Sequence, residues 1–287
     1  MTVRGRHTLG LIAAAVLFST GGAGIKAVHM SGPQVACLRA AVAAVAVALL
    51  LPDAHRRWNR ATILVGLAYS GGMSLFALAN KLTTAANTIY LQAAAPLYIL
   101  ALAPWLLKEP ARRRDLLLLA CLATGLVLVF LGAEAPAATA PAPFKGNVLA
   151  VLSGIAIALM MIGLRALARH GDGAAAAPAV LAGNIIAFAL NLPSALPFPW
   201  PTLSDVAILA FLGVFQIALA YALLARALRH VPALEASMLL LVEPALNPVW
   251  AWLIHHEVPS SRAIAGGMII LGATVAKSLL DAREPAG

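Results

Sequence analysis

Apolar stretches separated by short polar breaks run through the whole chain. Most are about 20 residues long, which is the length of helix that crosses a hydrocarbon layer about 30 Å thick. The pattern lacks the short alternating strands that a membrane-spanning barrel requires. We therefore predict an all-α membrane protein with ten spanning helices, at residues 9–28, 33–52, 61–80, 84–107, 114–133, 146–166, 178–197, 203–228, 232–254 and 262–280.

Composition supports lipid as the solvent of this chain. Of its 287 residues, 62% are hydrophobic and only 11% are charged, whereas soluble domains carry about 25% charged residues. The net charge of +9 does not indicate a nucleic-acid partner, because the basic residues sit in short loops between apolar stretches, where they orient a protein in a bilayer. We expect a multi-pass protein of a bacterial-type inner membrane, in contact with lipid.

The distribution of basic residues predicts the orientation. With the N-terminus in the cytoplasm, fifteen of the twenty Lys and Arg residues fall on the cytoplasmic side. Only Lys26, Lys81, Lys145 and Arg262 fall outside, and Arg39 lies inside the second span. The positive-inside rule therefore places both termini in the cytoplasm.

A low-complexity segment divides the chain into two halves. Residues 133–143 read AEAPAATAPAP, a Pro and Ala composition that cannot pack a core and is typical of a linker. Five predicted spans lie on each side, so the second half enters the membrane from the opposite face, as an inverted repeat does. We predict a first repeat at 1–133, an extracytoplasmic linker at 134–145 and a second repeat at 146–287.

The two halves share a sequence motif. Pro96 precedes Glu109 by thirteen residues, and Pro244 precedes Glu257 by thirteen, so the halves correspond at an offset of 148. A helix that contains Glu243-Pro244 and is followed by such a glutamate resembles the EamA family of the drug/metabolite transporter superfamily.

The resemblance covers nearly the whole chain and implies two five-helix inverted repeats that export small solutes. Within the family, the chain resembles the amino-acid and metabolite exporter branch, including exporters of aromatic amino acids. The first half departs from the pattern, because Ala95 stands where the second half has Glu243.

Glu243 is the strongest candidate for contact with a solute. An ionisable carboxyl inside a hydrophobic helix is costly unless it faces a wet cavity or a partner. Asn247 and Trp250 follow at i+4 and i+7, on the same helix face, so a carboxyl, an amide and an aromatic ring form one stripe. A purely structural role beside Pro244 and Pro248 is the alternative, and a proton exchanged at Glu243 would make protons the coupling ion.

Other intramembrane polar residues are candidates for the solute path as a group, although helix packing is the favoured explanation for any one of them. They are Tyr69, Asn80, Asn87, Tyr90, Tyr98, Asn184 and Gln216.

Two basic residues have open interpretations. Arg39 can bind a solute carboxylate or extend to the outer membrane surface, as long basic side chains do. Lys26, near the outer end of the first span, is a candidate for an exit gate, with an interfacial anchor as the favoured interpretation.

The leading hypothesis is a secondary transporter that exports aromatic or neutral amino acids by alternating access, as a monomer or homo-oligomer. The first alternative is efflux of organic cations at Glu243 and aromatic rings, against which Arg39 in the cavity would count. An intramembrane enzyme is more distant, because the seven His residues are scattered. We expect no cofactor and no metal.

Overall fold

The computed structural model describes residues 3–56, 58–106, 113–132, 135–169, 176–228 and 230–282, and within these ranges the chain is helical apart from connecting loops and one isolated bridge between Ala137 and Ala140. Its elements are, in order, α1 (Val3–Ser19), α2 (Gly21–Ala27), α3 (Gly32–Leu50), η1 (Pro52–His55), α4 (Arg60–Leu82), α5 (Ala85–Ala93), α6 (Ala95–Leu106), α7 (Arg113–Leu131), α8 (Pro143–Arg169), α9 (Ala176–Ala195), α10 (Leu203–Phe211), the π-helix η2 (Leu212–Leu219), α11 (Ala220–Ala227), α12 (Ala233–Leu240), α13 (Val242–His255) and α14 (Ser261–Ala282).

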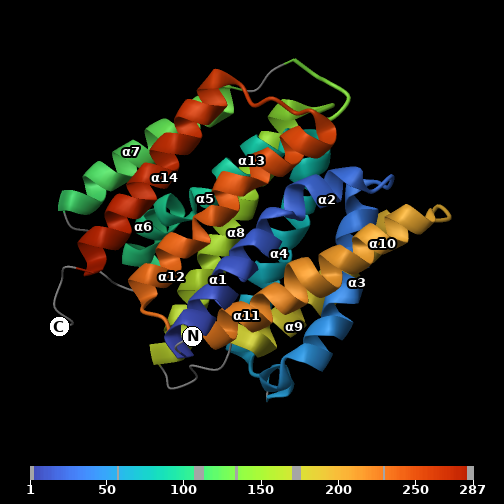
Figure 1. The fold of residues 1–287 in the computed structure, drawn as a ribbon, viewed down its shortest axis with the longest axis horizontal. Coiled ribbons are helices and arrows are strands. Elements are labelled where there is room, and N and C mark those ends of the chain that lie inside the picture. Colours follow the sequence, from blue (N-terminus) through green and yellow to red (C-terminus); the bar gives the residue numbers. More distant parts are fainter. Residues whose placement is uncertain are drawn as a thin grey trace.

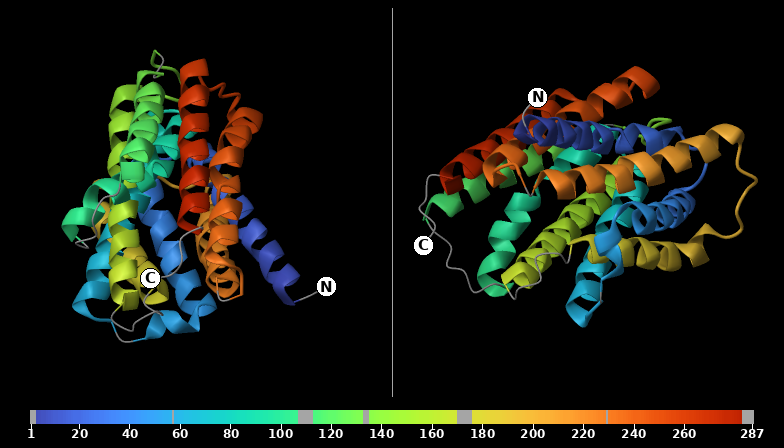
Figure 2. Two further views of the ribbon diagram at one scale, coloured as in Figure 1. Left: turned by 90° about the vertical axis from the view of Figure 1, so that its left-hand side faces the viewer. Right: turned by 60° about the horizontal axis from the view of Figure 1, so that its bottom comes forward.

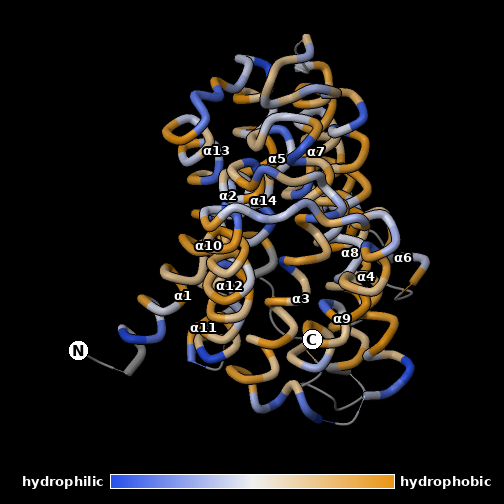
Figure 3. Tube along the Cα trace, turned by 90° about the vertical axis from the view of Figure 1, so that its right-hand side faces the viewer, coloured by the Kyte–Doolittle hydropathy of each residue, from blue (hydrophilic) through white to orange (hydrophobic). Residues whose placement is uncertain are grey.

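The prediction of an all-helical membrane protein is confirmed. Among the described residues, nine helical segments are long and apolar enough to cross a membrane, and the shorter apolar helix Leu116–Leu131 within α7 is a further candidate. Figure 3 shows hydrophobic positions along the helices and hydrophilic positions gathered toward the two ends of the bundle. The described residues therefore hold nine or ten candidate spans. Glu109, the first-half counterpart of Glu257, lies outside the described residues.

Three predicted spans are each divided into two helices by a short turn. The turns fall at Thr20 between α1 and α2, at Ala94 between α5 and α6, and at Leu241 between α12 and α13. The last two lie within one residue of equivalent positions at the offset of 148, and each precedes a proline, Pro96 or Pro244. A proline has no N–H to donate to the carbonyl four residues earlier, and its ring crowds that carbonyl, so each of these prolines favours a break in the helix just before it.

The helices pack in an order that interleaves the two halves of the chain. In the middle of the bundle, α4 packs against α8 and α9, while α3 lies against α9 and η2. On one face, α1 and α2 lie along α13, and at one edge α7 and α14 lie side by side (Figures 1 and 2).

The two ends of the bundle are distinguishable by their contacts. At the end where α1 begins, here called the terminal end, Thr8 Oγ1 donates to Glu235 Oε1 at 3.2 Å, and α14 finishes at the same end (Figure 1). At the opposite end, here called the linker end, Ala142 N donates to Leu82 O at 3.0 Å where α8 begins. Thus α1 and α8, the first long helices of the two halves, start from opposite ends.

The α7–α14 pair depends on two glycines. A methyl group at Gly266 would lie 2.5 Å from Gly125 O, and one at Gly125 would lie 2.8 Å from Gly266 O. Both obstacles are backbone atoms, which cannot rotate away. Small residues let two helices approach closely in lipid, where packing is a main source of helix association.

We predict that Gly266→Ala lowers the free energy of unfolding by about 1–3 kcal/mol, because the α7 backbone must shift to accept the methyl group. Thermal unfolding of the purified protein in detergent measures the change. Gly272→Ala is the control, since a methyl group there has no atom within 4 Å and alanine is a better helix former. Equal stability of the two variants would contradict the close approach.

Candidate functional site

A cavity of about 260 Å³ lies inside the bundle and is built by both halves of the chain. The first half contributes residues of α1, α3, α4 and α5, and the second contributes residues of α8, η2, α11, α12 and α13. The lining residues are Phe18, Arg39, Met73, Phe76, Gln92, Ile157, Met160, Met161, Gln216, Ile217, Tyr221, Leu224, Leu240 and Glu243. The three predicted residues that meet here are Arg39, Gln216 and Glu243.

Arg39 is held in the interior of the protein. Its side chain is 2% exposed, and Nη2 donates to Met73 O at 3.0 Å. Nη1 has no hydrogen-bond partner among the described residues. The guanidinium therefore does not extend to the membrane surface, and it offers the cavity a free donor and a positive charge.

Glu243 sits in the first turn of α13, directly after the turn at Leu241. Within the described part of the chain, no hydrogen bond or ion pair joins its carboxyl to another residue. The backbone N–H groups at a helix N-terminus carry a partial positive charge, which favours a carboxylate at this place. The cavity thus combines a cation from the first half with an acid from the second.

Gln216 reaches the cavity from the π-helix η2. Its Nε2 makes a long contact of 3.5 Å to Phe18 O, and its Oε1 has no partner among the described residues. π-Helical segments recur at functional sites because the wider turn redirects side chains. The amide therefore presents an acceptor to a ligand beside the donor of Arg39.

The rest of the wall is aromatic and thioether-rich, and the sequence did not single out its methionines. The ring of Phe18 meets that of Tyr221 edge to face at 5.1 Å, and Met73, Met160 and Met161 complete the surface. Unbranched methionines adapt to solutes of different shape. In a chain with this many apolar residues, nothing in the sequence separates cavity-lining Phe and Met from lipid-facing ones.

Gln92 is a polar lining residue that sequence reasoning missed. Its Nε2 donates to Ser153 Oγ at 2.7 Å, and Ser153 Oγ donates to Gly72 O at 2.7 Å. The available signal was the residue type itself, because a glutamine inside a span needs a partner. This chain of bonds ties the end of α5 to α8 and α4.

The predicted stripe on α13 faces α1 and α2, but only its first residue lines the cavity. Asn247 is fully buried against Gly22, where an added methyl group would lie 2.7 Å from Asn247 Oδ1. Trp250 Nε1 donates to Ser19 Oγ at 2.8 Å. Asn247 and Trp250 therefore lie along the helix contact that leads from the cavity toward the linker end.

The other predicted path residues lie away from the cavity lining. Asn184 Nδ2 donates to Tyr69 OH at 3.2 Å, and Asn80 Nδ2 donates within its own helix to Phe76 O at 3.0 Å. Asn87 lies near the linker end, where Nδ2 donates to Asn147 Oδ1 at 3.3 Å.

The two remaining tyrosines of the predicted path pack against glycines of neighbouring helices. Tyr90 faces Gly267 and Tyr98 faces Gly154. A role of any of these residues in the solute path stays a prediction.

Two helical halves that surround a charged, partly unpaired cavity, with broken helices beside it, are the arrangement of membrane carriers. The sequence profile of the EamA-like transporter family matches residues 7–131 and 144–278. The chain therefore belongs to the EamA-like transporter family, and the two matched segments are its two repeats.

The fold also matches a solved structure. A protein described only as "Crystal structure of protein" is similar over 97% of this chain and 98% of its own, with a TM-score of 0.62 and 19% sequence identity. At this identity, the similarity concerns the fold alone. No curated protein matches the chain by sequence.

We predict that Ser19→Ala lowers the free energy of unfolding by about 1 kcal/mol, because it leaves the indole N–H of Trp250 without its acceptor. Thermal unfolding in detergent measures the loss. Thr20→Val is the matched control, since Thr20 Oγ1 makes only a local bond to Leu17 O at 2.7 Å. A loss that is larger in Thr20→Val would show that the α1–α13 contact does not depend on this bond.

Proposed function

We propose that this protein is a secondary transporter that exports small amphipathic metabolites, with aromatic and other neutral amino acids as its substrates. The observation that supports this proposal is that Arg39 and Glu243 both line the same cavity. Membership of the EamA-like transporter family supports transport itself.

Opposite charges in one cavity suit a zwitterion. Arg39 has a free guanidinium N–H for a carboxylate, and charge-assisted bonds of this kind are among the strongest in proteins. Glu243 offers a carboxylate to an ammonium group, and Gln216 Oε1 adds a neutral acceptor. An amino acid carries a carboxylate and an ammonium group on one carbon, so one molecule can interact with Arg39 and with Glu243 at the same time.

The size and wall of the cavity favour a small solute with an apolar side chain. Its volume of about 260 Å³ lies just below the ~300–1,000 Å³ of pockets that take drug-sized ligands. Aromatic rings and methionines line much of it, and sulfur and ring contacts with an aromatic side chain are favourable.

Efflux of organic cations is the weaker alternative. A cation would gain from Glu243 and from the rings of Phe18 and Tyr221. Arg39 counts against it, because a buried positive charge repels a second one inside a cavity of low dielectric constant. An intramembrane enzyme would need acid and base groups that converge on a reacting atom, and the described lining residues contain only one carboxyl.

Direction and coupling complete the proposal. We propose that both termini face the cytoplasm of a bacterial-type cell and that the linker end faces outward, since the basic loops favour this orientation. Protons are the proposed coupling ion, with Glu243 as their carrier, because a carboxyl in a cavity can release its proton when it binds a solute and take up a proton when the solute leaves.

The deciding experiment is uptake by liposomes that contain the purified protein, with and without a pH gradient. Matched pairs of labelled solutes separate the candidate functions, such as phenylalanine with phenethylamine, which lacks the carboxylate. Saturable flux of the amino acid supports the proposal. Flux of the amine alone would overturn it in favour of cation efflux.

We predict that Arg39→Gln raises the apparent Michaelis constant for phenylalanine uptake by about tenfold or more, because binding weakens when a charged hydrogen bond is lost. The constant for phenethylamine should change much less, because that solute has no carboxylate. Thr124→Val is the control, since Thr124 Oγ1 bonds within its own helix to Ala120 O at 2.9 Å and does not line the cavity. Equal weakening of both solutes would argue against a carboxylate contact at Arg39.

We predict that Glu243→Gln abolishes the stimulation of uptake by a pH gradient, because glutamine fills the same space and binds no proton. The measurement compares initial rates with and without the gradient in wild type and variant. A variant that folds normally and keeps the full stimulation would remove Glu243 from the role of proton carrier.

A further inference from the structure

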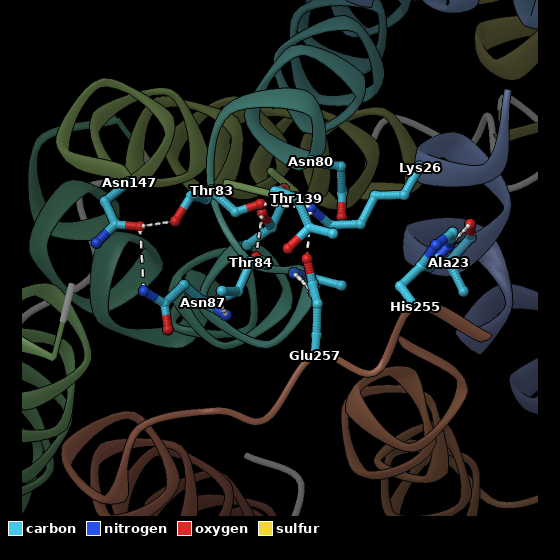
Figure 4. Close-up of polar contacts among 12 residues, drawn as sticks. Ala23, Lys26, Asn80, Thr83, Thr84, Asn87, Thr139, Asn147, His255 and Glu257 are labelled. Carbon is cyan, nitrogen blue, oxygen red and sulfur yellow. Dashed lines mark hydrogen bonds and ion pairs between the residues drawn. The ribbon is translucent and has the colours of Figure 1, made fainter. Parts of the chain in front are cut away.

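A buried ion pair closes the linker end of the molecule. Lys26 Nζ, at the end of α2, lies 2.8 Å from Glu257 Oε1, in the segment between α13 and α14. The two side chains are 5% and 3% exposed, so Lys26 is an interior residue and not an interfacial anchor. Figure 4 shows them meeting among polar groups of four chain segments.

Three backbone groups around the pair are bonded to it. Lys26 Nζ donates to Thr83 O at 2.8 Å and to Thr139 O at 2.5 Å, and Ala85 N donates to Glu257 Oε2 at 3.0 Å. The pair therefore connects α2, the α4–α5 turn, the linker and the α13–α14 segment. This ionic contact therefore joins the first half to the second half.

Two hydrogen bonds between α1–α2 and α13 precede the pair along the chain. The first is the Trp250–Ser19 bond described above, and the second is a 2.8 Å bond between His255 Nε2 and Ala23 O. From the cavity residues Phe18 and Glu243, both helices run along this series of contacts toward the linker end. If a solute leaves the cavity along this path, the contacts between α1–α2 and α13 and the Lys26–Glu257 pair must separate.

The ion pair distinguishes this place from the cavity. Arg39 Nη1 and Gln216 Oε1 have no partners among the described residues, as expected where a ligand supplies them. The ammonium of Lys26, in contrast, donates to two carbonyl oxygens and forms the ion pair with Glu257, and Glu257 Oε2 accepts from Ala85 N. Such an arrangement stabilises one conformation of the protein.

A second pocket, of about 280 Å³, lies on the linker side of the pair. Glu257 is in its wall, together with Thr83, Thr84, Asn87 and Thr139. Its polar lining allows water to enter when the pair separates. Solvation by that water replaces part of the interaction that the two charges lose.

We propose that the Lys26–Glu257 pair is the latch of the linker-end gate, which must open for the cavity to communicate with that side of the membrane. The proposal rests on the transport function proposed above. Breaking a buried pair by neutralising one partner leaves an uncompensated charge and strongly destabilises the state that contains it. Neutralisation should therefore shift the protein toward the state that is open at the linker end.

Thiol accessibility tests the latch without any substrate. The reporter is Ile157→Cys on the cavity wall, in a chain that carries Cys37→Ala and Cys121→Ala. A charged, membrane-impermeant methanethiosulfonate is added to sealed vesicles of either orientation, and labelling of Trp200→Cys, which is 99% exposed near the linker end, identifies the sidedness.

We predict that Lys26→Gln and Glu257→Gln each raise the labelling rate from the linker side by about tenfold or more. Lys81→Gln is the matched control, because Lys81, a lysine at the same end, bonds Val28 O at 2.5 Å and is not part of the ion pair. Lys26→Arg, which keeps the charge, should label close to the wild-type rate.

Two results would overturn the latch. One is wild-type labelling in both Lys26→Gln and Glu257→Gln, checked for folding by thermal unfolding. The other is an equal increase in Lys81→Gln, which would show that any loss of a lysine at this end loosens it. The labelling experiment needs no solute, so it is independent of the proposed substrate. If the protein transports no amino acid but the variants still show faster labelling, the proposed substrate is refuted and the proposed gate is supported.

Discussion

The hydrocarbon core of a membrane contains no water that could form hydrogen bonds with polar atoms of a protein. Each polar atom at that depth therefore needs a hydrogen-bond partner in the chain. The structure meets part of this requirement with local bonds of the Asn80 and Asn184 amide nitrogens and with the ion pair at the linker end. Several buried polar atoms have no partner among the described residues, and two of them, Arg39 Nη1 and Gln216 Oε1, belong to side chains that line the cavity. A solute in the cavity can supply the partners that these two atoms lack.

Broken helices give the cavity its shape. The turns at Ala94 and Leu241 let α6 and α13 start within the bundle, and α13 brings its N-terminal turn and Glu243 to the cavity. The π-helix η2 places Gln216 at the same level from another side. A regular helix in either place would satisfy its own backbone completely and aim different side chains inward.

The two repeats share a fold but divide the chemistry. Glu243 corresponds to Ala95 in the first half, so the carboxyl of the cavity comes from one repeat only, while its guanidinium comes from Arg39 of the other. The same division recurs at the linker end, where Lys26 belongs to the first half and Glu257 to the second. In both places a positive charge of the first half faces a negative charge of the second half, and the two attract each other. A relative motion of the halves must separate these charges.

The sequence alone determined the membrane class, the approximate spans and the two repeats, because these depend on the length of apolar runs and on spacing along the chain. It also identified Glu243, Arg39 and Gln216 as costly polar residues in lipid, but it left open whether Arg39 extends to the membrane surface. It did not separate them from Tyr69 or Asn184, whose side chains bond each other. Only the tertiary structure decided which polar groups share a cavity and that Lys26 pairs with Glu257. These contacts join residues as many as 231 positions apart, and helix periodicity sets the face of a helix but not its neighbour.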